Sequence, residues 1–149
     1  SLAFVLEDPR AVIREGMHYI PASSEYAAKL AFCLEVLENT GDPVSAWRHL
    51  DKHFERYNWI HAYPNLAADL LALWYGGGDF TESMSLLAKA GYDVDCNGGL
   101  VGNVLGVLHP VPQEWALPLG DLLETYIKGK EKISIKELAA RTAALAKRG

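Results

Sequence analysis

The sequence has few cysteines, no excess of basic residues and no long apolar run. Two distant thiols, Cys33 and Cys96, form neither a disulfide framework nor a CxxC metal motif. Lys and Arg number 14 against 19 Asp and Glu, a formal net charge of -5, which argues against nucleic acid or anionic membrane as a partner. No segment approaches the roughly 20 apolar residues of a membrane span. These absences favour a cytoplasmic protein.

The residues that are present suit a packed core. Half of the 149 residues are hydrophobic and 10% are aromatic, so intrinsic disorder is excluded. The length corresponds to one ordinary domain. We therefore expect a single domain over residues 1–149.

Helix-starting and helix-ending signals predict an all-α fold. Asp8-Pro9 and Asp42-Pro43 each place an N-cap residue before a proline. Capping boxes start at Asp79 and Ser134, and the last helix ends at Lys147-Arg148. No alternating run is long enough to predict a strand. The predicted helices cover residues 9–20, 24–40, 43–57, 65–75, 80–90, 99–108, 113–128 and 134–148.

Two of these segments are unusual in composition. Residues 65–75 are apolar except for Asn65 and Asp69, which predicts a central, buried helix. Residues 91–98 are expected to form a polar loop ahead of the next helix, in which Gly102 and Gly106 would allow a neighbouring backbone to approach closely.

Asp93 and Asp95 are the clearest candidates for chemistry. Two carboxylates this close repel each other unless a cation, a base or N–H donors neutralise them, and no Lys or Arg lies between Lys89 and Lys128. A hard divalent cation such as Mg²⁺ or Ca²⁺ would balance both acids. The alternative is that Asp95 caps the following helix while Asp93 is a solvated loop residue.

The histidines and cysteines give weaker signals. His49 and His53 share a helix face but lack the Glu of a zinc-protease helix, so a solvated face is the preferred interpretation. His61 lies among aromatic residues and is interpreted as a packed loop residue. Two neighbouring acids would raise the pKa of Cys96, which argues against an activated nucleophile.

Several motifs together resemble the ADP-ribosylglycohydrolase family, and specifically the C-terminal half of its domain. The most specific is the acidic loop at residues 91–97, Gly-Tyr-Asp-Val-Asp-Cys-Asn. The supporting motifs are Tyr63-Pro64-Asn65, Tyr75-Gly76-Gly77-Gly78-Asp79-Phe80, the glycine-containing helix up to Gly106, Gly41-Asp42, residues 20–24 and residues 111–115.

The resemblance implies a hydrolase that cleaves a glycosidic bond to ADP-ribose at a dinuclear Mg²⁺ site. Asp93 and Asp95 match the family's metal-binding acids, and Cys96 stands where many members have a ligating Thr. Tyr92 and Asn97 are expected to line the substrate pocket because they adjoin these acids. The implied partner is ADP-ribose or an ADP-ribosylated substrate.

The resemblance also implies an incomplete site. The family's other metal ligands come from an earlier Thr-Asp-Asp-type motif, and this chain contains no Asp-Asp pair. The alternative function is therefore a non-catalytic helical module for binding or assembly. A half-domain would expose apolar faces, so we expect a homodimer or association with a missing N-terminal portion, with the 65–75 helix as a candidate for the covered face.

Overall fold

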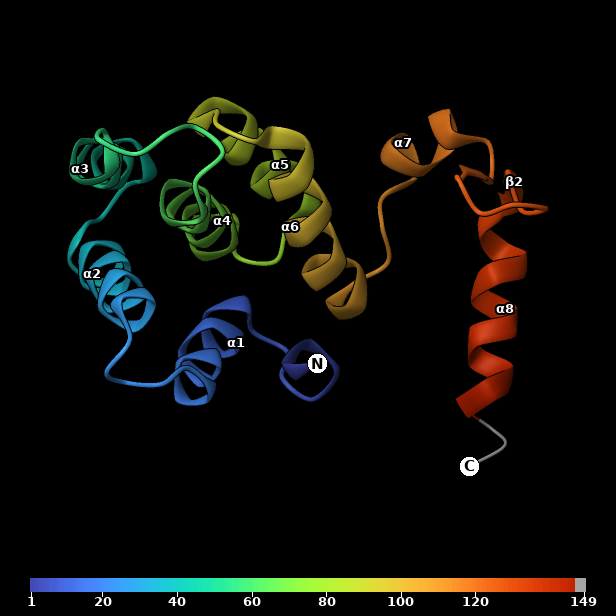
Figure 1. The fold of residues 1–149 in the computed structure, drawn as a ribbon, viewed down its shortest axis with the longest axis horizontal. Coiled ribbons are helices and arrows are strands. Elements are labelled where there is room, and N and C mark those ends of the chain that lie inside the picture. Colours follow the sequence, from blue (N-terminus) through green and yellow to red (C-terminus); the bar gives the residue numbers. More distant parts are fainter. Residues whose placement is uncertain (147–149) are drawn as a thin grey trace. The chain divides into compact units, whose positions relative to one another are not determined.

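A computed structural model gives the fold, and it describes residues 1–146 (Figure 1). The chain divides into two compact units, Ser1–Pro110 and Val111–Gly149. Helices dominate the described residues, and the strands among them form one two-stranded hairpin. The predicted all-α class is confirmed, whereas the single domain stays a prediction.

The first unit contains six α-helices and two short 3₁₀ helices. In chain order they are η1 (Leu2–Phe4), α1 (Pro9–Gly16), η2 (Met17–Tyr19), α2 (Glu25–Asn39), α3 (Pro43–Phe54), α4 (Ala62–Gly76), α5 (Phe80–Ala90) and α6 (Val94–Leu108).

Four of these helices, α1, α2, α3 and α5, begin at capping side chains that the sequence predicts. The carboxylates of Asp8, Asp42 and Asp79 accept hydrogen bonds from backbone N–H groups at 3.0, 2.9 and 2.7 Å. Ser24 does the same for α2, with its Oγ accepting from the Ala27 N–H at 3.1 Å. Each bond satisfies a donor that the helix itself leaves free, so most helix starts follow directly from local sequence.

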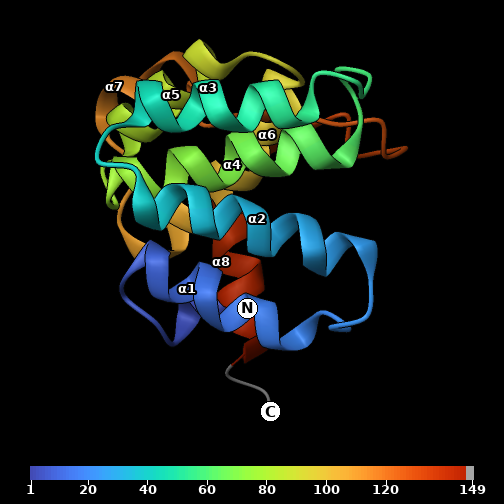
Figure 2. The same cartoon turned by 90° about the vertical axis from the view of Figure 1, so that its left-hand side faces the viewer.

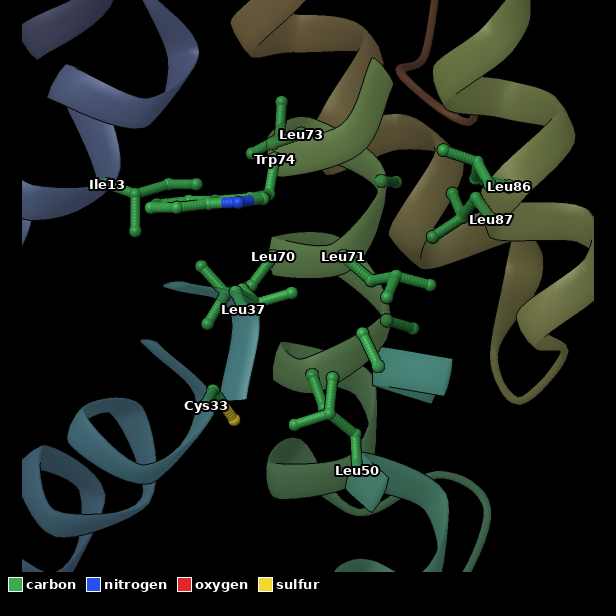
Figure 3. Close-up of a cluster of buried hydrophobic side chains, with 14 of the residues drawn as sticks. Ile13, Cys33, Leu37, Leu50, Leu70, Leu71, Leu73, Trp74, Leu86 and Leu87 are labelled. Carbon is green, nitrogen blue, oxygen red and sulfur yellow. The ribbon is translucent and has the colours of Figure 1, made fainter. Parts of the chain in front are cut away.

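Helix α4 lies at the centre of the unit, between the other helices (Figure 2). Ile13 and Leu37 approach α4 from one side, and Leu86 and Leu87 approach it from the other (Figure 3). Burying each large aliphatic side chain contributes about 1.5–3 kcal/mol. The prediction of a buried central helix is therefore confirmed.

The same packing corrects one expectation about association. Residues 65–75 are covered by helices of their own unit, with Ala67, Ala68 and Ala72 fully buried. A second chain is therefore not needed to bury this helix, and it was the wrong candidate for an interface. Association itself, as a homodimer or with an N-terminal portion, stays a prediction.

The predicted loop at residues 91–98 is too long. α6 begins at Val94, so Asp95, Cys96 and Asn97 lie in its first turn rather than in a loop. Gly91 and Tyr92, with φ of 80° and 63°, complete the reversal from α5 within two residues. The glycines that follow lower helix propensity, but packing against α4 and α5 overrides it.

The second unit is where local prediction was least accurate. A helix was expected over 113–128, but the structure has α7 (Gln113–Ala116), η3 (Leu117–Leu119) and β1 (Leu122–Glu124). Gly120 and Asp121 adopt φ of 57° and 62°, a left-handed conformation that ends a helix. The expectation of no strand was also wrong, because strands this short carry no readable alternation.

Strand β1 pairs antiparallel with β2 (Lys132–Ser134), with Leu123 opposite Ile133. α8 (Ile135–Ala146) follows directly, and the Ser134 Oγ accepts from the Glu137 N–H at 3.0 Å, as the capping box predicts. The predicted end at Lys147-Arg148 lies outside the described residues. None of the described helices has the length and apolar content that crossing a membrane requires.

Candidate functional site

The candidate site lies where α5 turns into α6. Gly91 ends α5, Tyr92 occupies a left-handed conformation, and Asp93 is the N-cap residue of α6. A left-handed conformation is unusual for a tyrosine, so contacts beyond this turn must hold it. The turn places Asp93 just before the helix and Asp95 and Cys96 in its first turn.

The structure brings the three predicted ligands together. One carboxylate oxygen of Asp93, one of Asp95 and the Cys96 Sγ all lie within 4.8 Å of one another. Asp93 is half-buried, and the other two are exposed. Among residues 1–146, this is the one group of three or more His, Cys, Asp or Glu side chains with such spacing.

The alternative interpretation assigned a capping role to Asp95 and a solvated loop position to Asp93. Asp95 does not cap α6, because it lies inside the first turn. Asp93 occupies the capping position, but its side chain makes no capping hydrogen bond. Asp93 therefore lacks the capping bond seen at Asp8, Asp42 and Asp79, while the Asp95 carboxylate accepts from the backbone N–H groups of Asp95 and Cys96.

Local interactions shift the pKa values of Asp95 and Cys96 in opposite directions. A hydrogen bond with Asp93 lowers the pKa of Asp95, helped by the backbone N–H groups of Asp95 and Cys96. A hydrogen bond with Asp93 and its charge raise the pKa of Cys96, so the thiol stays protonated at neutral pH. Two carboxylates suit a hard cation such as Mg²⁺, whereas a protonated thiol is a poor ligand for it.

Asn65, at the start of α4, is the residue near the site that the sequence analysis did not identify as functional. Its Oδ1 accepts hydrogen bonds from the Asp93 backbone N–H at 3.0 Å and from the Asn97 Nδ2 at 2.7 Å. Asn97 is thus buried, only 4% exposed, with its amide directed to α4. Its predicted contact with substrate stays a prediction.

The Tyr92 side chain contacts two residues of α3. Its hydroxyl donates to the Asp51 Oδ1 at 2.6 Å, and its ring meets that of Trp47 edge to face at 5.7 Å. Burial, followed by the Asp51 hydrogen bond and charge, raises the pKa of Tyr92 to about 12. The hydroxyl therefore stays protonated, and the predicted role of Tyr92 in the substrate pocket is untested.

The group of three side chains contains no histidine and does not include Cys33. His49 and His53 are both exposed, in keeping with a solvated face, and His53 stacks on Phe32 with ring centroids 3.8 Å apart. His61 caps α4, with its Nδ1 accepting from the Tyr63 N–H at 3.2 Å, which agrees with a packed loop residue. Cys33 is fully buried in the core.

Comparison with known proteins gives one match. The family model described as ADP-ribosylglycohydrolase matches residues 1–148. No curated protein and no solved structure matches the chain.

Proposed function

Because this match makes the chain a member of the ADP-ribosylglycohydrolase family, we propose that it takes part in Mg²⁺-dependent cleavage of a glycosidic bond to ADP-ribose. The convergence of Asp93, Asp95 and Cys96 within 4.8 Å carries the proposal. In it, Asp93 and Asp95 hold the cation, and Cys96 adjoins it as a weaker third ligand.

The residues around the acids would hold and shape the site. A cation held by Asp93 and Asp95 would supply Lewis-acid polarisation for hydrolysis at the anomeric carbon. Asp93 and Asp95 contribute negative charge without acting in proton transfer, which differs from the paired-carboxylate glycosidase scheme. In this proposal ADP-ribose binds beside the acids, next to Tyr92 and Asn97. A cytoplasmic location is part of the same proposal.

The alternative is a non-catalytic helical module for binding or assembly. It is favoured by the absence of an Asp-Asp pair from the sequence and by the lack of a second group of metal-ligating side chains among residues 1–146. In this case a homodimer, or a separate N-terminal portion, would complete the structure or use it as a docking surface.

Release of ADP-ribose distinguishes the hydrolase from the non-catalytic module. The chain is incubated with a mono-ADP-ribosylated peptide in Mg²⁺ or EDTA, and free ADP-ribose is measured by chromatography. We expect release in Mg²⁺ only, and loss of release in Asp93→Asn and Asp95→Asn but not in Glu35→Gln, an exposed acid on α2. Release that persists in EDTA would contradict metal dependence, and no release under any condition would favour the module.

A further inference from the structure

Asn65 connects the chain just before α4 to the start of α6, which lies about 30 residues later. Its Nδ2 donates to the carbonyl oxygens of Trp59 and His61 at 2.8 and 2.9 Å. Its Oδ1 accepts from the Asp93 N–H and from the Asn97 Nδ2. All the hydrogen-bonding capacity of a side chain that is only 8% exposed is therefore used.

The two hydrogen bonds that the Asn65 Oδ1 accepts come from Asp93 and Asn97, at the two ends of the segment that contains Asp95. Asp93 is fixed through its backbone N–H, one of the groups that the start of α6 leaves without a helical partner. Asn97 lies one helical turn later, and its backbone N–H donates to the Asp93 carbonyl oxygen at 2.9 Å. The Asn65 oxygen thus fixes both ends of the segment that carries Asp95 and Cys96.

From this arrangement we infer that Asn65 is a positioning residue for the candidate metal site. It holds residues 93–97 in the conformation in which the ligand atoms of Asp93, Asp95 and Cys96 converge. The inference rests on the proposed function where it concerns a metal, but the positioning itself exists without one. Residues that orient metal ligands typically change metal affinity by roughly 10–100-fold when they are replaced.

Hydrogen exchange of the Asp93 amide, followed by NMR on the full chain without metal, tests the positioning. In the wild type this amide should exchange at least about tenfold more slowly than in an unstructured peptide. Asn65→Ala should lose that protection at residues 93–97 while the core of α4 and α5 keeps its own. An Asp93 amide that is already unprotected in the wild type overturns the inference, whether or not any variant folds.

Two further variants separate positioning from simple packing. Asn65→Asp keeps an oxygen acceptor and should retain more protection at Asp93 than Asn65→Ala does. Asn103→Ala is the matched control, because Asn103 is an exposed asparagine of α6 whose side chain donates to the Gly99 carbonyl oxygen within the same helix. Equal protection at Asp93 in all four proteins would overturn the inference.

Mn²⁺ titration of the same proteins separates this inference from the proposed function. We expect Asn65→Ala to bind Mn²⁺ at least about tenfold more weakly than the wild type and Asn103→Ala to bind it unchanged. If the wild type binds no Mn²⁺ while Asn65→Ala still loses protection, the proposed function fails and the positioning role stands. If the wild type and Asn65→Ala bind Mn²⁺ equally, the positioning role fails and the metal site stands.

Discussion

Asp69 is a carboxylic acid inside the apolar core of the first unit. It is 6% exposed, and its Oδ1 has no hydrogen-bond partner. Burial raises its pKa from 3.8 to about 7. Between these values the folded chain holds a proton that the unfolded chain has lost, so the free energy of unfolding falls as pH rises through this range and levels off above it.

Replacing Asp69 with asparagine should remove this pH dependence. A shift of one pKa unit corresponds to about 1.4 kcal/mol, and two units separate pH 5 from the folded pKa of about 7. Asp69→Asn should therefore stabilise the protein by about 3 kcal/mol more at pH 8 than at pH 5. Urea unfolding at both values measures the difference, with Glu35→Gln as the exposed control. If the free energies of unfolding of Asp69→Asn and the wild type change equally between pH 5 and pH 8, Asp69 is not desolvated.

Gly76 of α4 packs closely against Ser83 of α5. A Cβ added at Gly76 would lie 1.9 Å from the Ser83 Oγ and 3.0 Å from the Ser83 Cα. Gly76→Ala should therefore lower the free energy of unfolding by roughly 1–3 kcal/mol, since the backbone of α5 must shift. Gly99→Ala is the control, because nothing lies within 4 Å of its added Cβ; equal stabilities of the two variants would contradict the close approach.

At the scale of elements, the start of α6 depends on α3 as well as on α4. The Tyr92 hydroxyl reaches Asp51 at 2.6 Å across the helix interface, and this bond helps to hold a left-handed backbone. Tyr92→Phe should cost about 1 kcal/mol of stability and increase amide exchange at residues 91–93. Asp51→Asn, which keeps an acceptor, should have a smaller effect, and an effect equal to that of Tyr92→Phe would argue against the bond as the cause.

How far an element can be predicted depends on whether its signals are local. The starts of α1, α2, α3 and α5 were predicted because each cap bonds to a backbone N–H two or three residues away. The helix expected over 113–128 was wrong because Gly120 and Asp121 both adopt left-handed conformations. The glycine is a local stop signal that the prediction did not use.

The candidate site follows the same distinction. Asp93, Asp95 and Cys96 are neighbours in sequence, so their proximity could be predicted from spacing alone. Asn65 lies 28 residues before Asp93 and bonds to its backbone N–H because α4 packs against α6. Only the position of Asn65 next to Tyr63-Pro64, before a buried helix, indicated it from sequence, and that pattern carries no information about the partner of its amide.

For the molecule as a whole, the apolar core belongs to the first unit. The buried hydrophobic residues of the core run from Ile13 to Leu105. None of the residues described in 111–145 is buried. A fragment of residues 1–110 should therefore fold cooperatively, with helical circular dichroism and a melting temperature within about 5 °C of the full chain. A fragment that melts without a cooperative transition would show that residues 111–149 are needed for the fold.

Calorimetric titration of the full chain with Mg²⁺ tests the central claim, that Asp93 and Asp95 hold a divalent cation, most directly. We expect saturable binding in the wild type and in Glu35→Gln, and binding at least about tenfold weaker in Asp93→Asn and Asp95→Asn. No saturable heat in the wild type at millimolar Mg²⁺, or equal affinities in all four proteins, would contradict it.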